Sequence, residues 1–360
     1  MSDLVLHITG ARPNFPKAAP VIRRLAELGV AQELVHTGQH YDERMSAVFF
    51  RELGLPEPDV DLGVGSGTHA RQTAAIMIGL EEMFERRRPA MVVVYGDVNS
   101  TLAAALVSAK LQVSLAHVEA GLRSFDMTMP EEINRLVTDR LSDLLFATSA
   151  DAVAHLGNEG IDAGRIHLVG NPMIDTLLAN LDRFDVRAVR NQHQLDERYV
   201  VATLHRPGNV DDPADAAALV KAMHAVADQV EVLLPLHPRG MARLGSVGLF
   251  DHPKLRVIEP LGYVEFLALM RGADVVVTDS GGVQEETTIL GVPCLTLRPN
   301  TERPITISHG TNQLVTREGL PQAVEDCLRA GRAESWPVPP LWDGRAGERI
   351  AAVIAAEVGR

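Results

Sequence analysis

Three carboxylates stand where an acid or a base could act on a bound substrate. Asp97 and Glu119 each follow an apolar run at a glycine turn, and Glu131 begins a helical pattern directly after Pro130. If the three side chains lie close together, mutual repulsion raises the pKa of some of them and supplies both an acid and a base near pH 7. The alternative roles are local: Asp97 as a helix N-cap, and Glu131 as a charge that complements a helix dipole.

Cationic side chains occupy the loops after other apolar runs: Arg12, Lys17, His205, Arg206 and His237. Cations at the start of a helix are unfavourable to its dipole, so a bound anion would compensate for Arg12 and Lys17. An ion pair with a distant acidic residue is the alternative for these two. Each histidine taken singly is more simply structural, but two such loops in one half of the chain favour anion binding.

Ser280, Gly281 and Gly282 form a phosphate-binding pattern between an apolar run and a helical segment. Ser280 is a good N-cap, and the two glycines allow backbone N–H groups at the helix start to approach a phosphate. Glu285 and Glu286 would repel a phosphate, so we expect them to accept hydrogen bonds from hydroxyls such as those of a ribose. Their alternative role is to complement the helix dipole.

Two more residues belong to this candidate ligand site. Tyr263 begins a helical segment after an apolar run and could present its ring to a base. Arg303 follows the last long apolar run, again at the carboxyl end of a predicted strand.

Short apolar runs alternate with longer amphipathic segments along the whole chain, which predicts parallel sheets covered by helices on both faces. The predicted strands are 3–9, 33–37, 91–95, 113–118, 143–147, 166–169, 199–204, 231–236, 255–258, 273–278 and 293–297. The predicted helices are 16–29, 42–53, 71–87, 99–110, 131–142, 151–159, 214–229, 263–271, 283–290, 320–330 and 344–358. Such sheets bind ligands at the carboxyl ends of their strands, and most of the residues singled out above are expected in the loops that follow strands.

The length of 360 residues suits two domains. The polar segment 182–198 is expected to be a linker, and the proline-rich run 337–340 a second one. We therefore predict one Rossmann-like α/β domain from residues 1–172 with 344–360, whose last helix returns to it, and a second from residues 173–343. Doubly wound domains with facing strand ends would enclose a cleft.

Composition excludes several classes of partner. The formal net charge of −13 disfavours nucleic acid and anionic membrane surfaces as general partners. No apolar run reaches membrane-spanning length, and the N-terminus shows no signal-peptide pattern, so we expect a cytoplasmic protein. The cysteines Cys294 and Cys327 have no metal or disulfide spacing, and Cys294 is expected to be a core residue.

The motifs taken together, in their order and spacing, resemble the non-hydrolysing UDP-N-acetylglucosamine 2-epimerases over nearly the whole chain. The segments that carry the resemblance are 10–13 with Lys17, 38–40, 71–73, 96–97, 117–123, 130–135, 205–206, 279–286 and 301–304. The resemblance implies a glycosyltransferase-B-like fold, a homodimer, and interconversion of UDP-N-acetylglucosamine and UDP-N-acetylmannosamine. It implies elimination of UDP to 2-acetamidoglucal followed by re-addition, with neither NAD nor a metal as cofactor.

The resemblance also assigns residues. It implies that Asp97, Glu119 and Glu131 are the acid–base carboxylates and that His205 contacts the diphosphate. It makes ligands of the UDP-sugar out of Arg12, Lys17, Tyr263, Ser280, Gly281, Gly282 and Glu286. The candidates Arg206, His237 and Arg303 are expected to bind substrate because they follow predicted strands. Gln39, His40 and Arg71 resemble part of a second, allosteric nucleotide-sugar site, although the residues after His40 depart from the family pattern.

Other functions remain open. A hydrolysing 2-epimerase would release UDP in step with free sugar, and a glycosyltransferase on the same fold would need an acceptor. An epimerase of a modified UDP-acetamido sugar would require a different decoration of the ring. A nucleotide-sugar sensor would bind without turnover, which the complete set of three carboxylates disfavours.

Overall fold

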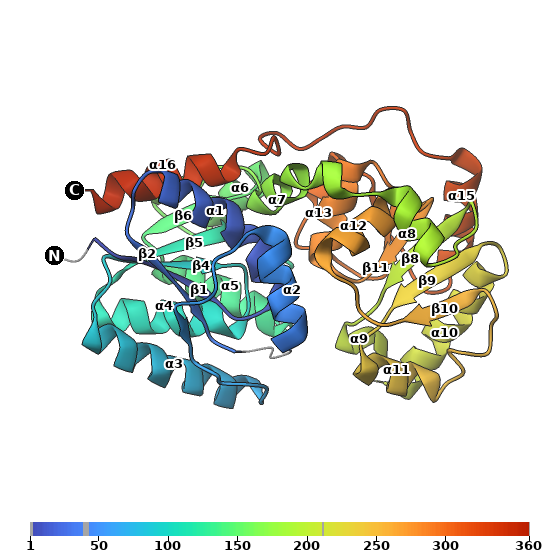
Figure 1. Cartoon of the computed structure of the whole chain (residues 1–360), viewed down its shortest axis with the longest axis horizontal. Coiled ribbons are helices and arrows are strands. Elements are labelled where there is room, and N and C mark those ends of the chain that lie inside the picture. The colour runs from blue at the N-terminus through green and yellow to red at the C-terminus, as the bar shows by residue number, and fades with distance from the viewer. Residues whose placement is uncertain (1–2, 39–42, 211, 360) are drawn as a thin grey trace. The chain divides into compact units, whose positions relative to one another are not determined.

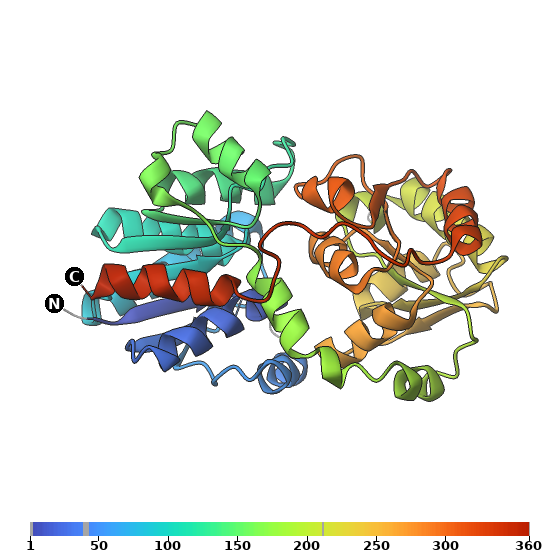
Figure 2. The ribbon, with the colours of Figure 1, turned by 90° about the horizontal axis from the view of Figure 1, so that it is seen from above.

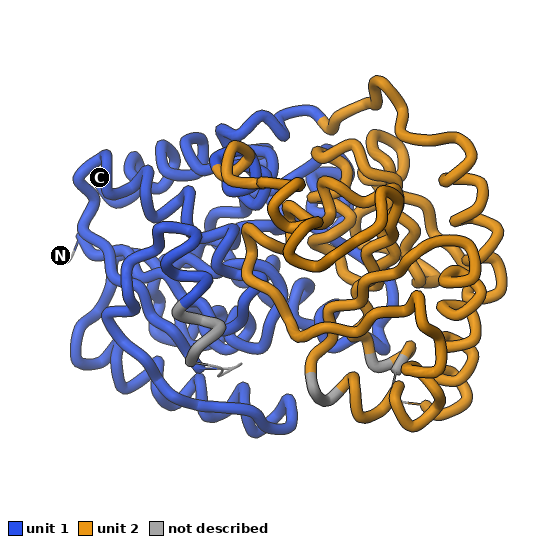
Figure 3. The backbone as a smooth tube through the Cα atoms, turned by 45° about the vertical axis from the view of Figure 1, so that its right-hand side comes forward, with its two compact units in different colours: residues 1–179, 340–360 blue, residues 180–339 orange. Residues whose placement is uncertain are grey.

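The computed structural model describes residues 3–38, 43–210 and 212–359. The chain forms two compact units, one of residues 1–179 with 340–360 and one of residues 180–339, which Figure 3 distinguishes by colour. Each unit has its own parallel sheet. The first break follows Ala179 because helix α7 (Pro172–Ala179) packs against α1 (Phe15–Glu27) and is part of the first unit.

The sheet of the first unit has the strand order β3-β2-β1-β4-β5-β6-β7, and every pair of neighbours is parallel. The strands are β1 (Val5–Thr9), β2 (Gln32–His36), β3 (Val60–Asp61), β4 (Met91–Tyr95), β5 (Ser114–Ala120), β6 (Leu144–Ala147) and β7 (Ile166–Leu168). The chain runs outward from β1 to β3 and then crosses to β4 on the other side of β1. In open parallel sheets, ligands bind where the direction changes in this way, which here is at the carboxyl ends of β1 and β4.

Helices cover both faces of this sheet (Figure 1). Helices α3 (His69–Arg86) and α4 (Asn99–Leu111) lie on one face, and α1 lies on the other. Three consecutive alanines of α4, residues 103–105, are completely buried, and their small side chains allow the helix to approach the strands closely. The remaining helices of this unit are α2 (Glu43–Leu53), α5 (Pro130–Leu141) and α6 (Ala150–Asn158).

The last helix, α16 (Ala346–Val358), packs against α1 and α7, as the sequence predicts. The Asp175 carboxylate accepts hydrogen bonds from the first backbone N–H groups of α16, at 3.1 Å from Ala346 N and 2.7 Å from Gly347 N. The indole of Trp342 donates to the carbonyl of Thr148 at 3.0 Å. These contacts fix the returning segment on the first unit, where Figure 2 shows α16 in red.

The sheet of the second unit repeats the same plan with six parallel strands in the order β10-β9-β8-β11-β12-β13. Its strands are β8 (Tyr199–Thr203), β9 (Glu231–Pro235), β10 (Leu255–Ile258), β11 (Val275–Thr278), β12 (Cys294–Thr296) and β13 (Asn312–Leu314). The direction of progression changes between β8 and β11, so the loops after these two strands are neighbours.

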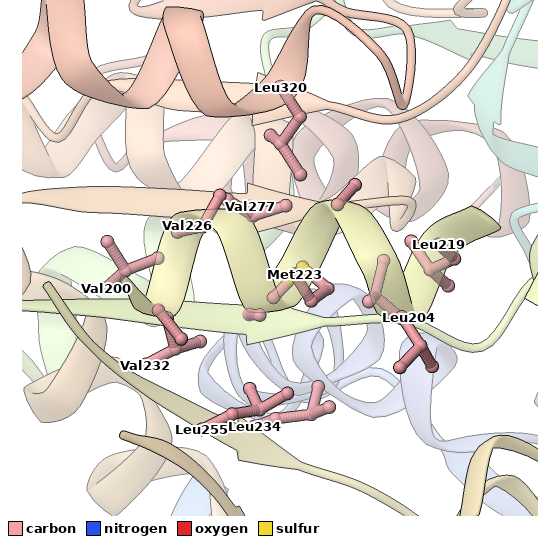
Figure 4. Packing of buried hydrophobic residues seen from close by; sticks show 14 of the residues in the cluster. Val200, Leu204, Leu219, Met223, Val226, Val232, Leu234, Leu255, Val277 and Leu320 are labelled. Atoms are coloured by element: carbon pink, nitrogen blue, oxygen red, sulfur yellow. The ribbon is translucent and has the colours of Figure 1, made fainter. Parts of the chain in front are cut away.

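A continuous apolar core lies on one face of the second sheet, under α10 (Pro213–Ala227) and α15 (Leu320–Ala330). Figure 4 shows Met223 of α10 with Val200 and Val232 of the sheet to its left and Leu320 of α15 above the helix. Helices α12 (Tyr263–Gly272) and α13 (Gly281–Leu290) cover the opposite face (Figure 1).

The predicted linker 182–198 is wrong as a structural assignment. It contains α8 (Val186–Gln192), which packs against α12 through the buried Val189. Glu265 of α12 accepts hydrogen bonds at 2.8 Å from the side chains of both Gln192 and His193. The sequence also did not predict several other elements: helices α7, α9 (Pro207–Val210), α11 (Pro238–Gly245) and α14 (Ile305–Ser308), and strands β3 and β13. Like α8, each of them spans too few residues to show a clear hydrophobic period.

Two simpler predictions are also decided. Cys294 is 1% exposed and lies in the core, as predicted. None of the helices in the described part of the chain is long and apolar enough to span a membrane.

Candidate functional site

In the first unit, Lys17 and Glu119 form a buried ion pair at the carboxyl ends of the central strands. Their side chains are 6% and 3% exposed, so water screens the pair poorly. Asn14 stabilises the loop that leads to Lys17: its side-chain carbonyl accepts at 3.0 Å from both Gly10 N and Ala11 N. The ion-pair alternative for Lys17 is therefore correct, and its partner is a predicted acid–base residue.

The backbone around this pair has an unusual conformation. Glu119 has a φ of +77°, a backbone conformation that is strained for residues other than glycine. The register between β5 and β6 also shifts between Val118 and Ala120. Gly96 has a φ of +65°, and a Cβ there would lie 2.9 Å from Lys17 Nζ and 3.0 Å from Glu119 Oε2. Glycine at this position therefore leaves room for the ion pair beside the loop that follows β4.

The N-cap residue of α4 is Val98, so Asp97 does not have the alternative N-cap role. Its carboxylate pairs with Arg135 of α5, and its carbonyl accepts from Asn134 Nδ2 at 2.8 Å. The Asp97 side chain is 24% exposed, so the carboxylate remains accessible to a ligand.

The two adjacent glutamates of α5 have different surroundings. Glu132 is 1% exposed and accepts from Ser124 N at 2.9 Å, Phe125 N at 3.0 Å and Arg135 Nη2 at 2.6 Å. Burial alone would raise the pKa of Glu132, but these donors and the Arg135 charge hold it below its usual value. Glu132 is thus a structural residue, whereas the half-buried Glu131 has no hydrogen-bond partner for its carboxylate among the described residues.

Asp139, which the sequence did not single out, connects the β4 and β5 loops. It is completely buried and accepts from His117 Nδ1 at 2.6 Å, Arg123 Nη1 at 2.7 Å and Gly121 N at 3.1 Å. The second ring nitrogen of His117 contacts the carbonyl of Gly96 at 2.9 Å. Burial opposes ionisation of Asp139, yet His117 and Arg123 keep its pKa below the usual value. One face of α5 therefore sets the relative positions of the predicted catalytic loops.

In the second unit, His205 and Asp279 meet at the point where the progression of strands changes direction. His205 Nδ1 lies 2.9 Å from Asp279 Oδ1, and Asp279 also accepts from the backbone N–H groups of His205 and Arg206. The imidazole is 64% exposed, whereas Asp279 is fully buried. The ring of this predicted catalytic residue is thus fixed at one nitrogen and accessible to solvent.

A cluster of arginines surrounds Glu302 beside the start of α13. Glu302 accepts from Arg298 Nη2 at 2.6 Å, pairs with Arg303, and lies 3.9 Å from Arg206 Nη2. Arg303 also pairs with Glu285 at 2.9 Å. Three guanidinium groups and two carboxylates thus lie together beside the helix start, where guanidinium N–H groups are available to an anion.

Ser280 occupies the N-cap position of α13, as predicted, but its hydroxyl makes no capping hydrogen bond. Gly281 is required by close packing: a Cβ there would lie 2.8 Å from both Arg303 Cζ and Glu302 Oε1. Gly282 is half-buried beside it. The helix start thus presents backbone N–H groups next to the arginine cluster, which is the arrangement a phosphate prefers.

Glu286 and Tyr263 form a buried pair, 6% and 5% exposed. Burial, and then the neighbouring Glu285 charge, raise the pKa of Glu286 to about 8, while a hydrogen bond with Tyr263 lowers it. The Tyr263 ring is therefore enclosed and contacts Glu286, instead of presenting an open surface to a base.

The remaining candidates have other surroundings. The half-buried Arg12 guanidinium is 5.8 Å from the centre of the Phe49 ring, a cation–π contact. His237 is exposed at the N-cap position of α11, and Arg71 is exposed near the start of α3. Gln39 and His40 lie outside the described residues.

Solved structures with this architecture include enzymes that act on nucleotide sugars. The crystal structure of the UDP-GlcNAc 2-epimerase of Methanocaldococcus jannaschii, in complex with UDP-GlcNAc and UDP, superimposes with a TM-score of 0.92. It is 42% identical, and the match covers 98% of this chain and 99% of that one. The Neisseria meningitidis UDP-GlcNAc 2-epimerase bound to UDP-GlcNAc gives a TM-score of 0.88 at 27% identity, covering 98% of this chain and all of that one. The fold is therefore of the predicted glycosyltransferase-B-like class.

Sequence relatives define the family within that class. The M. jannaschii UDP-N-acetylglucosamine 2-epimerase is 44% identical over 359 residues, which is 96% of this chain and 97% of that protein. A UDP-2,3-diacetamido-2,3-dideoxy-D-glucuronate 2-epimerase of Pseudomonas aeruginosa is 43% identical over 98% of this chain and 99% of that protein. The UDP-N-acetylglucosamine 2-epimerase family model matches residues 23–355. The chain belongs to this family.

Proposed function

We propose that this protein interconverts UDP-N-acetylglucosamine and UDP-N-acetylmannosamine without net hydrolysis. The observation that carries the proposal is the buried Lys17–Glu119 pair at the strand ends, where Glu119 is held in a strained conformation. Strain of this kind is concentrated at functional sites, because surrounding structure must maintain it. The similarity to the M. jannaschii enzyme over almost the whole chain supports the same activity.

The reaction begins at C2 of the sugar. A base removes the C2 proton while the bond between C1 and the diphosphate oxygen breaks, and its electron pair leaves with UDP to give 2-acetamidoglucal. UDP then adds back to C1 as a proton is delivered to the other face of C2. Each step needs an acid or a base at C2, for which we propose Asp97, Glu119 and Glu131.

The C2 proton is weakly acidic, so the leaving diphosphate must be stabilised strongly. We propose that His205, Arg206 and Arg303 do this together with the N–H groups of Gly281 and Gly282. The unused Ser280 hydroxyl supports this assignment, because it has no capping hydrogen bond to lose when a phosphate binds.

The other ligand roles follow the same logic. We propose that Glu286 receives the ribose hydroxyls and that Tyr263 supports it. Arg12, Lys17 and His237 are proposed to contact the diphosphate or sugar. Lys17 already neutralises Glu119, so it can stabilise either that carboxylate or the departing anion.

A modified sugar is the second candidate substrate, because the P. aeruginosa relative named for a diacetamido glucuronate is nearly as similar as the M. jannaschii enzyme. A panel of UDP-acetamido sugars with and without a C6 carboxylate would decide. If the UDP-sugar with the C6 carboxylate is turned over faster, it is the substrate, and UDP-N-acetylglucosamine is not.

Proton NMR of UDP-N-acetylglucosamine in deuterated water tests the reaction. The manno isomer with deuterium at C2 and little free UDP is the expected result. Free UDP accumulating in step with N-acetylmannosamine would show a hydrolysing enzyme, and exchange that requires an added acceptor would show a glycosyltransferase.

Three properties implied by the family resemblance are also proposed. The protein is expected to act in the cytoplasm and to form a homodimer, which cell fractionation and analytical ultracentrifugation would test. Gln39, His40 and Arg71 are proposed to bind a second nucleotide sugar. Initial rates that remain hyperbolic in the substrate, and unchanged in Arg71→Ala, would contradict that second site.

A further inference from the structure

The Asp279 carboxylate accepts its hydrogen bonds from the segment that follows β8. Its Oδ1 lies 2.9 Å from His205 Nδ1, while Oδ2 accepts from His205 N at 3.0 Å, Arg206 N at 2.9 Å and Asn209 Nδ2 at 3.0 Å. One buried carboxylate therefore holds both the backbone of this loop and the imidazole ring.

The charge of Asp279 decides which nitrogen of His205 carries the fixed proton. Burial would raise the pKa of Asp279, but the hydrogen bonds from His205, Asn209 and Arg206 N hold it below its usual value. An ionised carboxylate can only accept hydrogen bonds, so His205 Nδ1 must donate. Nε2 is then the ring nitrogen left to a ligand, on an imidazole that is 64% exposed.

We propose that Asp279 is a positioning residue, which fixes the Nδ1–H form of His205 and thereby presents Nε2 to the diphosphate. The proposal rests on the function proposed above. When Nε2 is protonated, it donates a hydrogen bond to the diphosphate oxygen that receives the electron pair from C1. Asp279 itself is buried and acts on the substrate only through the ring.

Asp274 provides a matched control, because it occupies the opposite end of the same two strands. Its Oδ2 accepts from Tyr199 N at 3.0 Å, just as Asp279 accepts from His205 N, and its other oxygen pairs with Arg198. Both aspartates thus connect β11 to β8, but only Asp279 holds a histidine ring. Loss of charge at Asp274 tests the structural role alone.

The experiment compares Asp279→Asn with Asp274→Asn in the full chain. In D279N the amide oxygen can keep the backbone N–H groups, which turns the NH2 group toward His205 Nδ1. That nitrogen must then accept, so Nδ1 can no longer stay protonated while Nε2 donates, and the doubly protonated ring that Asp279 stabilises is lost. We expect kcat to fall by about 100-fold or more, the direction seen when a triad aspartate is replaced by asparagine. The Kd for UDP should change by less than about threefold, and D274N should retain the parent kcat.

Long-range proton–nitrogen NMR of the His205 ring gives the readout that a purely structural role would not change. The parent protein should show a protonated Nδ1 without any substrate, and D279N should show the Nε2–H form. An unprotonated Nδ1 in the parent would overturn the proposal even if D279N failed to fold. Effects of D279N and His205→Asn that multiply in the double variant would also overturn it, because Asp279 would then act independently. Because the NMR readout needs no turnover, a parent protein without epimerase activity would refute the proposed function and leave this assignment testable.

Discussion

A methyl group at Gly96 tests whether the position of the Lys17–Glu119 pair controls activity. In Gly96→Ala the new Cβ would lie 2.9 Å from Lys17 Nζ and 3.0 Å from Glu119 Oε2, closer than side-chain carbons normally approach. The ends of these two side chains are the atoms that can move, so we expect the pair to be displaced. A misplacement of about 1 Å at a reacting group can cost about 100-fold in rate. We therefore expect kcat to fall by about 10- to 100-fold.

The positive φ of Gly96 adds a separate cost that must be subtracted. Alanine in the left-handed region costs about 1–2 kcal/mol whatever its surroundings. Gly160 has a φ of +77°, and a Cβ added there would meet no heavy atom within 4 Å, so Gly160→Ala carries the strain without the collision. Urea unfolding should show a loss of about 1–2 kcal/mol for Gly160→Ala and a larger loss for Gly96→Ala.

The assay is steady-state epimerisation of both variants and the parent at equal concentrations of folded protein. Gly160→Ala should keep the parent kcat. Equal kcat values for Gly96→Ala and Gly160→Ala would refute the reasoning, because the geometry of the ion pair would then be irrelevant to turnover.

Three further predictions concern single groups of the site. Glu119→Gln should abolish turnover while UDP binding, measured by calorimetry, stays near the parent value; full activity would remove Glu119 from the catalytic set. Ser280→Ala should mainly weaken UDP affinity, and unchanged affinity would place the phosphate elsewhere. The pKa of Glu286 is raised from its ordinary 4.5 to about 8, so the stability that its protonated form contributes is complete below pH 4.5 and is lost as the pH rises through 8. Glu286→Gln cannot ionise, so urea unfolding at pH 6 and pH 9 should show its stability rising relative to the parent at the higher pH; a constant difference would contradict the burial of that charge.

The sequence by itself determined the alternation of strands and helices and the loops in which the site residues stand. This information is local, because a buried parallel strand is a short apolar run and a covering helix repeats its apolar positions every three or four residues. The same locality explains the errors. Segment 182–198 is polar because most of α8 is exposed, yet the buried side chains of Phe184 and Val189 and the contacts of Glu265 show that it is packed.

Only the tertiary structure decided which residues act on one another. Glu131 and Glu132 are adjacent and chemically alike. The fold nevertheless buries Glu132 and gives it hydrogen bonds from Ser124 and Arg135, whereas the Glu131 carboxylate has no hydrogen-bond partner among the described residues. Asp139 is a signal that sequence reasoning could have used, since it lies on the same face of α5 as Glu132 and Arg135, at a spacing where polar residues would otherwise face solvent.

The decisive pairs are separated widely along the chain. Lys17 and Glu119 are 102 positions apart, and the backbone N–H of His205 reaches the Asp279 carboxylate across 74. Such contacts depend on strand order, which places β1 beside β4 and β8 beside β11, and no local period encodes that order. The charge state of a buried carboxylate depends in turn on these partners, because burial and neighbouring donors oppose each other and only the three-dimensional arrangement sets the balance.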